Sequence, residues 1–211
     1  MIIIQPSIEL ILTENPVNVL KKIEHAGRVC YKSEEKITED SYISFIKGII
    51  QRGHLAVLEH GSLSVLIKCD RGVTHELVRH RIASYCQEST RYCNYGKQNR
   101  ISLIPMMDGL SPDQQQRRRD LYARIEQVYL AEILEGVKPQ QARDNLPTCL
   151  KTEIMVTMNF REWLYFLELR GSKAAHPQIR KIAIMILEEF KRKIPVIFDS
   201  LIIKDLLIAK E

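Results

Sequence analysis

The sequence has no apolar segment long enough to cross a membrane. Its longest purely apolar runs are hexamers such as IAIMIL at 182–187, whereas a membrane-spanning helix needs about 18 residues or more. The first residues, MIIIQPSIEL, lack the basic start of a secretory signal. These absences argue against a membrane-embedded or secreted protein, and we expect a cytoplasmic location.

Cysteine and glycine are sparse, and neither forms a familiar site. The five cysteines are scattered without a C-x-x-C pair, so reduced thiols are the simplest interpretation. The nine glycines form neither GxGxxG nor GxxxxGK, and a bound nucleotide must therefore be held in another way. HELVRH at 75–80 places its histidines five apart, which is the wrong spacing for a zinc helix, and we expect no metal.

The length, hydrophobic content and net charge of the chain indicate a globular protein with an anionic ligand. The 211 residues are 45% hydrophobic, which predicts one domain over residues 1–211 with a sizeable core. Thirty-one basic residues against 26 acidic ones give a formal net charge of +5. This charge suits an anionic partner but does not distinguish a nucleotide from a nucleic acid.

Helical patterns outnumber strand patterns. We expect helices from Thr38 as N-cap to Gly53, from Ser111 to Gly136, at 160–170 and after Pro177, with a short one starting at Pro139. The apolar stripe expected on the second of these helices consists of Leu121, Ile125, Val128, Tyr129 and Ile133. The stripe expected on the last consists of Ile179, Ile182, Ala183, Ile186, Leu187 and Phe190. Strands are predicted at 62–69 and 150–159. The pattern predicts an α+β (or α/β) fold with a mixed sheet and several long helices.

The segment VRHRIASYCQESTRYCNY at 78–95 concentrates polar side chains. We expect a helix over 72–81, with Thr74 as a cap, and a loop over 84–95. On such a helix Arg79 and Arg81 would lie about 200° apart with His80 between them. They would then meet two anionic groups, or a ligand and a second subunit. Ser89 and Arg91 offer a hydroxyl and a fork of donors for a phosphate.

Two simpler interpretations stand beside this one. The arginines could be ordinary surface charges, or Tyr85, Tyr92 and Tyr95 could form a stacking platform for RNA or single-stranded nucleic acid. The density of the segment weighs against both, because three arginines, a histidine, Gln87, Glu88 and Ser89 fall within 13 positions.

The spacing within this segment resembles a known family signature. Arg79-His80-Arg81, seven residues and then Ser89 is similar to the RHR-x7-S motif of the flavin-dependent thymidylate synthases. Further matches occur in the expected order along most of the chain: Arg28-Val29, Gly53-His54, Glu59-His60, Gly136-Val137, Ala142-Arg143, Leu146-Pro147, Asn159, Arg161 and Leu169-Arg170.

The resemblance implies an enzyme that converts dUMP to dTMP. Methylenetetrahydrofolate would be the carbon donor and FAD, reduced by NADPH, the hydride carrier. It also implies a homotetramer with active sites where subunits meet, and partners that include neither a nucleic acid nor a membrane. The family needs no enzyme nucleophile, so Ser89 is expected to position and polarise the substrate.

The resemblance assigns roles residue by residue. The residues expected to bind dUMP are Arg79, Gln87, Glu88, Ser89, Thr90, Arg91, Arg143 and Arg170. Those expected to bind FAD are Arg79, His80, Arg81, Gln87, Asn159 and Arg161. Arg170 is the catalytic residue, because it would lie beside the uracil imide and favour its ionised form. His54 matches a histidine near flavin and folate, with a capping or packing role as an equal alternative.

Four places depart from the family pattern. Glu76 stands where glutamine is frequent, Ala56 and Val57 replace a hydroxyl residue and proline, Tyr165 replaces an asparagine that helps bind flavin, and Cys30 replaces a small hydroxyl residue. These departures bear on the affinity for nucleotide and cofactor rather than on the reaction class.

Overall fold

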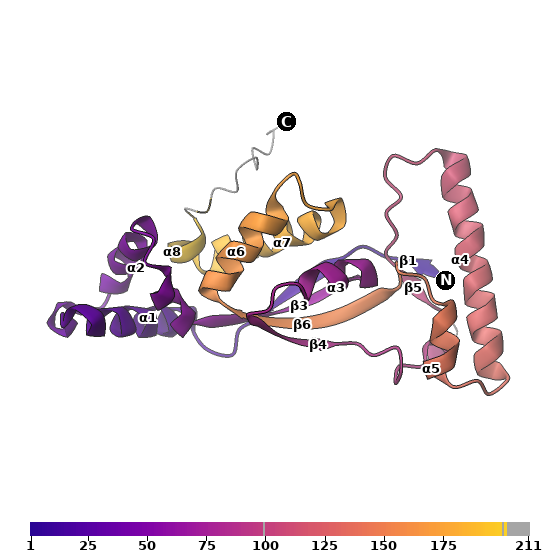
Figure 1. The fold of residues 1–211 in the computed structure, drawn as a ribbon, viewed down its shortest axis with the longest axis horizontal. Coiled ribbons are helices and arrows are strands. Elements are labelled where there is room, and N and C mark those ends of the chain that lie inside the picture. Colours follow the sequence, from indigo (N-terminus) through magenta and orange to yellow (C-terminus); the bar gives the residue numbers. More distant parts are fainter. Residues whose placement is uncertain (99, 200, 202–211) are drawn as a thin grey trace. The chain divides into compact units, whose positions relative to one another are not determined.

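The computed structural model describes residues 1–98, 100–199 and 201, and it has the mixed α and β composition that the sequence predicts (Figure 1). The strands are β1 (Ile2–Ile3), β2 (Ser7–Ile11), β3 (Ser62–Asp70), β4 (Ala83–Gln87), β5 (Ser102–Leu103) and β6 (Lys151–Asn159). The helices are α1 (Pro16–Tyr31), α2 (Ser41–Gln51), α3 (Arg71–Leu77), α4 (Pro112–Leu134), α5 (Pro139–Ala142), α6 (Phe160–Gly171), α7 (Pro177–Lys193) and α8 (Pro195–Phe198). Short 3₁₀ helices cover Glu34–Lys36, Leu55–His60, Tyr95–Gln98 and Arg143–Asn145.

The main sheet has the strand order β2-β3-β6-β4, and β1 pairs with β5 in parallel. Along β3 and β6 every second residue is buried, which is the period of two expected for strands with one face covered. The strands predicted at 62–69 and 150–159 are thereby confirmed to within one residue at each end.

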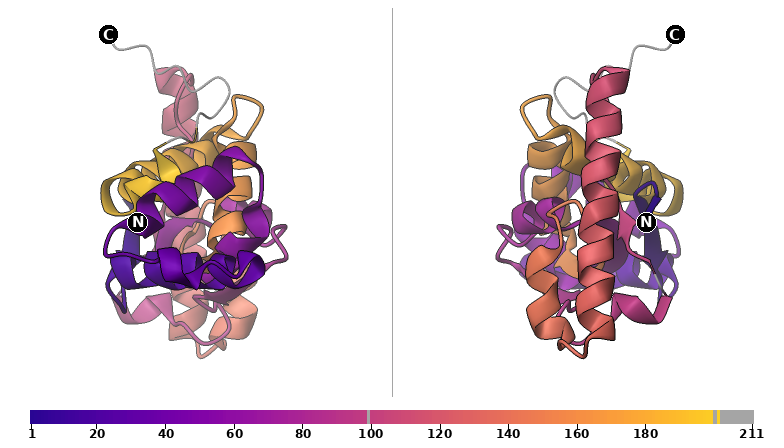
Figure 2. Two further views of the ribbon diagram at one scale, coloured as in Figure 1. Left: turned by 90° about the vertical axis from the view of Figure 1, so that its left-hand side faces the viewer. Right: turned by 90° about the vertical axis from the view of Figure 1, so that its right-hand side faces the viewer.

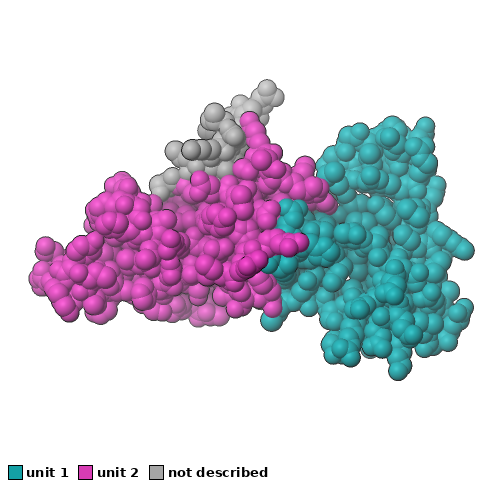
Figure 3. All heavy atoms as spheres, viewed as in Figure 1, with its two compact units in different colours: residues 1–7, 67–78, 86–154 teal, residues 8–66, 79–85, 155–211 magenta. Residues whose placement is uncertain are grey.

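The chain divides into two compact units (Figure 3). Unit 1 contains Met1–Ser7, Ile67–Val78 and Cys86–Ile154. Unit 2 contains Ile8–Leu66, Arg79–Tyr85 and the described part of Met155–Glu211. The chain enters each unit several times, so residues distant in the sequence become neighbours within a unit.

Unit 1 is built around the long helix α4, which Figure 2 shows together with α5. Ser111 and Gln114 form a capping box at its start, and Gly136 beyond its end has a φ of 90°, a conformation that glycine adopts without strain. The predicted bounds of this helix are confirmed. Its buried face differs from the predicted stripe: Tyr122 and Tyr129 are buried, Ile125, Val128 and Ile133 are half-buried, and Leu121 is 56% exposed. The core of this unit comprises Ile101, Leu103, Tyr122, Tyr129, Ala142 and Leu150.

Unit 2 has an aromatic core under α6 and α7, which lie side by side (Figure 1). Trp163 meets Phe166 and Phe190 edge to face at 5.5 and 5.2 Å, and its indole nitrogen donates to the carbonyl of Leu63 at 3.1 Å. All six residues of the apolar stripe predicted after Pro177 are buried. This core fixes α6, which carries several of the predicted site residues.

The expected helix over 72–81 is wrong in both its cap and its length. Asp70, not Thr74, is the N-cap of α3, and its carboxylate accepts from the backbone N–H of Val73 at 3.0 Å. The helix ends at Leu77, with Val78 as C-cap. Arg79, His80 and Arg81 therefore lie beyond the helix, and the 200° separation inferred from helical geometry does not apply to them.

Two other expectations need correction. The loop predicted over 84–95 begins with four residues of β4, which is hydrogen-bonded to β6 at the edge of the sheet. The N-cap of α2 is Asp40 rather than Thr38, because the N–H of Thr38 bonds the side chain of Ser41 at 2.9 Å and the chain enters the helix two residues later.

Candidate functional site

The imidazole of His80 lies between the acidic side chain of Glu162 and the basic side chain of Arg170, and all three residues belong to unit 2. Its Nδ1 is 3.1 Å from Oε1 of Glu162, and its Nε2 accepts the Nε–H of Arg170 at 3.2 Å. The histidine is 3% exposed and Glu162 9% exposed. The result is a chain of Glu162, His80 and Arg170, buried at its first two members and half-buried at Arg170, that joins the middle of the RHR segment to both ends of α6.

The contact with Arg170 determines the protonation state of His80. A guanidinium can donate a hydrogen bond but cannot accept one, so Nε2 of His80 must carry a lone pair. The imidazole is therefore neutral, and its proton is on Nδ1, which donates it to Glu162. Burial lowers the pKa of His80, Glu162 opposes this effect, and the positive charge of Arg170 lowers the pKa further.

The rest of His80 is also held in place. Its ring meets the edge of Phe166 at 5.0 Å and Tyr165 at 5.7 Å between centroids. Its carbonyl accepts from the hydroxyl of Tyr85 at 2.7 Å, and burial raises the pKa of that hydroxyl to about 12. Every polar group of His80 named here has a partner of fixed geometry, so the orientation of the ring is strongly determined.

A pocket of about 480 Å³ opens beside this chain in unit 2. Its walls include the apolar or aromatic side chains of Leu55, Ile82, Leu164 and Tyr165. Its polar lining comes from Asn159, Arg161, Glu59, Glu162 and Glu168. Pockets of this size hold small molecules in many proteins, and the exposed ring of Tyr165 with Ile82 offers a surface for a flat aromatic group.

Two residues expected to bind FAD, Asn159 and Arg161, therefore line one pocket. Asn159 is the N-cap of α6, and its side chain accepts from the N–H of Glu162 at 2.8 Å. Arg161 forms an ion pair with Glu59 at 2.7 Å, and both side chains are about half exposed. An anionic ligand would thus compete with Glu59 for the guanidinium.

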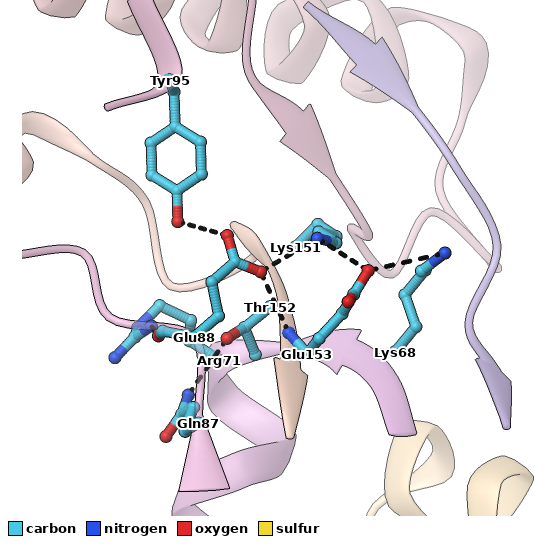
Figure 4. Close-up of polar contacts among 8 residues, drawn as sticks. All are labelled: Lys68, Arg71, Gln87, Glu88, Tyr95, Lys151, Thr152 and Glu153. Atoms are coloured by element: carbon cyan, nitrogen blue, oxygen red, sulfur yellow. Dashed lines mark hydrogen bonds and ion pairs between the residues drawn. The ribbon is translucent and has the colours of Figure 1, made fainter. Parts of the chain in front are cut away.

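The carboxylate of Glu88 is the centre of a second polar cluster, which lies in unit 1 (Figure 4). One oxygen accepts from the hydroxyl of Tyr95 at 2.8 Å. The other accepts from the ammonium of Lys151 at 2.9 Å and from the N–H of Glu153 at 3.2 Å. Both oxygens of Glu88 are engaged within the protein, so this side chain anchors the segment after β4.

The charged side chains of Lys151 and Glu153 shift the pKa values of one another toward the charged forms. Burial opposes the charged form of Lys151, but hydrogen bonds with Glu88 and Glu153 outweigh it and raise the pKa of the ammonium. The hydrogen bond from Lys151 lowers the pKa of Glu153. Lys68 lies 3.6 Å from Glu153 in a more exposed pair (Figure 4). The contacts of Lys151 and Glu153 with each other therefore favour the charged form of both side chains.

The residues on either side of Glu88 are also ordered by internal bonds. The side-chain N–H₂ of Gln87 donates to the hydroxyls of Thr74 at 3.1 Å and Thr152 at 3.3 Å. The hydroxyl of Ser89 accepts from the N–H of Arg91 at 3.2 Å. Ser89 thus closes a turn that presents the exposed guanidinium of Arg91, which lies 5.2 Å from the ring centroid of Tyr92.

The remaining predicted residues lie as follows. Arg79, Arg81, His54 and Arg143 are exposed, and Thr90 is buried. His54 has its Nδ1 3.3 Å from the hydroxyl of Tyr31. Of the residues expected to bind dUMP, Arg79 and Arg170 belong to unit 2 and the others to unit 1. Within unit 2 the structure brings His80 and Arg170 into contact. Within unit 1 it places the predicted residues at 87–91 in one turn.

The tyrosines do not form the stacking platform that was weighed against this site. Tyr85 and Tyr95 are partly buried, and their hydroxyls bond to His80 and Glu88. Tyr92 is 75% exposed. A single exposed ring does not provide the successive surfaces that single strands require.

The sequence did not reveal Glu162 or Lys151 as part of either cluster. Glu162 follows Asn159 by three residues, a pattern that indicates only the start of a helix. Lys151 begins a strand and has no motif around it. In residues 1–98, 100–199 and 201 there is no group of acidic, cysteine and histidine side chains suited to a metal, and no helix with the length and hydropathy to span a membrane.

The protein has a mixed α+β fold, with a chain of polar contacts through His80 and an adjoining pocket in unit 2 and a polar cluster around Glu88 in unit 1. The chain belongs to the thymidylate synthase complementing protein family, whose model matches residues 12–196. Proteins named flavin-dependent thymidylate synthase are similar to it. The one from Pyrococcus furiosus is 34% identical over 174 residues, covering 81% of this chain and 71% of the relative. That of Corynebacterium efficiens is 36% identical over 196 residues, covering 83% and 77%.

A solved structure shows the same fold. The crystal structure of a UMP/dUMP methylase, PolB, from Streptomyces cacaoi bound with 5-Br dUMP matches with a TM-score of 0.75. The match covers 94% of this chain and 96% of the other, at 22% sequence identity. The arrangement of strands and helices is therefore shared well beyond the RHR segment.

Proposed function

We propose that this chain is a flavin-dependent thymidylate synthase that methylates dUMP to dTMP. The carbon donor is methylenetetrahydrofolate, and FAD reduced by NADPH carries the hydride. The observation that carries the proposal is the bond between Arg170 and His80. This bond joins His80 of the RHR-x7-S signature to Arg170, 90 residues away, which also matches a position of the family. The chain itself belongs to that family.

Arg170 is the residue that promotes the chemistry. Its guanidinium stays protonated at working pH, and beside the uracil imide it stabilises the negative charge that develops on the ring. Its Nε donates to His80, and this bond orients the guanidinium that would face the nucleotide. When bound in its NADPH-reduced form, the flavin would supply the hydride that completes the methyl group, so the proposal requires no enzyme nucleophile.

The nucleotide is held by Arg79, Gln87, Glu88, Ser89, Thr90, Arg91 and Arg143 together with Arg170. The turn closed by Ser89 presents Arg91 as an exposed donor for phosphate, and Arg143 is likewise exposed. The carboxylate of Glu88 is engaged by Tyr95 and Lys151, so Glu88 acts by fixing this turn and through its backbone.

The flavin is held by Arg79, His80, Arg81, Gln87, Asn159 and Arg161. In the pocket beside α6, Tyr165 and Ile82 would contact the flat ring and Arg161 would offer a cation, while Glu59, Glu162 and Glu168 also line this pocket. Arg161, which pairs with Glu59, would hold the anionic part of the cofactor in place of that carboxylate. His54 contacts flavin or folate.

The assembly and location complete the proposal. Residues 1–211 act as one catalytic domain in a homotetramer whose active sites lie between subunits. The protein works in the cytoplasm, without a nucleic acid or membrane partner.

A turnover assay tests the proposal. Wild-type protein supplied with dUMP, methylenetetrahydrofolate, NADPH and FAD is expected to form dTMP, to carry or take up FAD, and to shift the flavin spectrum when dUMP is added. Arg170→Ala is expected to lose dTMP formation far more than flavin binding. A colourless protein that ignores FAD but binds oligonucleotides with steep salt dependence would contradict the proposal.

A further inference from the structure

Glu162 is a buried acid with no assigned role. It lies in the first turn of α6, where its backbone N–H is bound by the cap residue Asn159 at 2.8 Å. Its side chain reaches Nδ1 of His80 at 3.1 Å. Burying a carboxylate at 9% exposure is costly unless a donor compensates it, and the imidazole N–H is such a donor.

The contact with Glu162 favours the same tautomer of His80 as the contact with Arg170 does. With Glu162 present, the proton of the neutral ring is drawn to Nδ1, and Nε2 keeps the lone pair that accepts from Arg170. In the other tautomer Nε2–H would face the Nε–H of Arg170, and two donors cannot bond each other. Loss of the carboxylate would leave the buried Nδ1–H without its acceptor and so weaken the preference for the tautomer that accepts from Arg170.

We propose that Glu162 is a positioning residue that fixes the Nδ1–H tautomer of His80 and thereby the orientation of the Arg170 guanidinium. The inference rests on the proposed function, in which Arg170 must be aligned with the uracil imide. The same logic governs metal sites, where a carboxylate orients a histidine ligand through its second nitrogen. A misplacement of about 1 Å of a catalytic group can reduce a rate by about a hundredfold.

Two replacements separate positioning from simple packing. Glu162→Gln keeps a carbonyl oxygen that can accept from Nδ1, whereas Glu162→Ala removes the acceptor. Glu188→Ala is the matched control, since Glu188 is an exposed acid on α7 of the same unit. A packing role predicts lower stability for both Glu162 variants and the same histidine tautomer in each.

The tautomer is measured directly on the full chain. Nitrogen NMR of protein labelled with ¹⁵N-histidine distinguishes a protonated from an unprotonated ring nitrogen, and loss of one signal pair in His80→Gln assigns His80. Wild type, Glu162→Gln and Glu188→Ala are expected to show Nδ1–H with Nε2 unprotonated. Glu162→Ala is expected to move toward Nε2–H. An unchanged His80 tautomer in a folded Glu162→Ala overturns the inference.

Kinetics supply the second readout. Glu162→Ala is expected to lower kcat for dTMP formation about 10- to 100-fold while FAD affinity changes less, and Glu162→Gln is expected to restore most of the rate. Equal losses in both variants, or a loss confined to KM, contradict the positioning role. A wild-type protein that forms no dTMP overturns the proposed function instead, so the two failures are distinguishable.

If Glu162→Ala does not fold, Glu162→Gln is the deciding variant. A changed His80 tautomer in Glu162→Gln, or a rate as low as that of Arg170→Ala, overturns the inference.

Discussion

Glu88 and Lys151 form an ion pair at 2.9 Å in which both side chains are largely shielded, at 15% and 20% exposure (Figure 4). The pair connects the segment that carries Ser89 and Arg91 to the first residue of β6. The hydroxyl of Tyr95 and the N–H of Glu153 complete the bonds to the carboxylate. A residue that the family resemblance assigns to the substrate is thus held chiefly by the protein itself.

Breaking this pair should weaken both the fold and nucleotide binding. Glu88→Gln leaves the partly buried ammonium of Lys151 without its closest carboxylate partner, and we expect the free energy of unfolding to fall by about 1–3 kcal/mol. The KM for dUMP should rise, because the turn at 89–91 loses its anchor. Denaturant unfolding and initial-rate kinetics measure the two effects.

A control comes from the same cluster. Lys68→Met removes a more exposed partner that lies 3.6 Å from Glu153, and exposed pairs contribute about 0–1 kcal/mol. The double variant Glu88→Gln/Lys151→Met should be less destabilised than the sum of its single variants. Strict additivity would show that the ion pair does not hold the turn.

Tyr165 should contribute to flavin affinity through its ring rather than its hydroxyl. It is 55% exposed, lines the pocket beside α6 and lies 5.7 Å from the ring of His80. Stacking of aromatic rings is worth about 0.5–1.5 kcal/mol, so Tyr165→Ala should weaken FAD binding by about two- to tenfold. Tyr165→Phe should bind as wild type does.

Fluorescence titration of the apoprotein with FAD measures these affinities. Leu134→Ala, at an 86% exposed position of unit 1, is the control for removal of an exposed apolar side chain. Equal affinities for Tyr165→Ala and wild type would remove Tyr165 from the flavin site.

The helices were predictable from the sequence where local signals decide them. Ser111 with Gln114 and the glycine at 136 mark both ends of α4 in the sequence, and the structure uses both. The start of α3 was misjudged because Thr74 resembles a cap, whereas Asp70 at the end of β3 fills that role. β4 was missed because its formation depends on pairing with β6, and a pairing between distant segments leaves no local pattern.

The site was predictable only as separate residues. The family resemblance names His80 and Arg170, which are 90 positions apart, but their contact follows from the packing of α6. Glu162 belongs to no motif, and only its depth in the structure distinguishes it from an ordinary acid in the first turn of a helix. A single sequence does not report such burial, since the same residue on a solvent-facing turn would look identical.

The stability of the protein should decrease on mild acidification because of His80. Burial and Arg170 lower the pKa of this imidazole in the folded state, whereas in the unfolded chain it is about 6.5. Between these two values the unfolded state binds more protons, so the free energy of unfolding falls as the pH drops below about 6.5. The groups facing His80 are Glu162, Arg170, Tyr85 and Tyr165.

Denaturant unfolding of wild type and His80→Gln between about pH 7.5 and 5.5 tests this linkage. The variant should be less stable at neutral pH but should lose less stability on acidification. Parallel pH dependences in the two proteins would show that another group is responsible.

Gly61 should be intolerant of even one added methyl group. A Cβ built on it would lie 2.5 Å from the ring of Phe160 and 2.8 Å from Val19, while the carbonyl of Gly61 accepts from the N–H of Phe160 at 3.0 Å. Overpacking a core costs about 1–3 kcal/mol, so Gly61→Ala should lower the free energy of unfolding by that amount. Because Phe160 follows Asn159 at the start of α6, displacement of its ring should also weaken FAD binding.

Gly48→Ala provides a control of the opposite sign. Gly48 lies inside α2, where the nearest atom to an added Cβ is the end of the flexible Arg52 side chain at 3.2 Å. Alanine is favoured over glycine within a helix by about 0.5–1 kcal/mol, so this variant should be more stable than wild type and should bind FAD equally well. If Gly61→Ala were as stable as Gly48→Ala, the close approach of Gly61 to Phe160 would be wrong, and with it the placement of Asn159 beside the pocket.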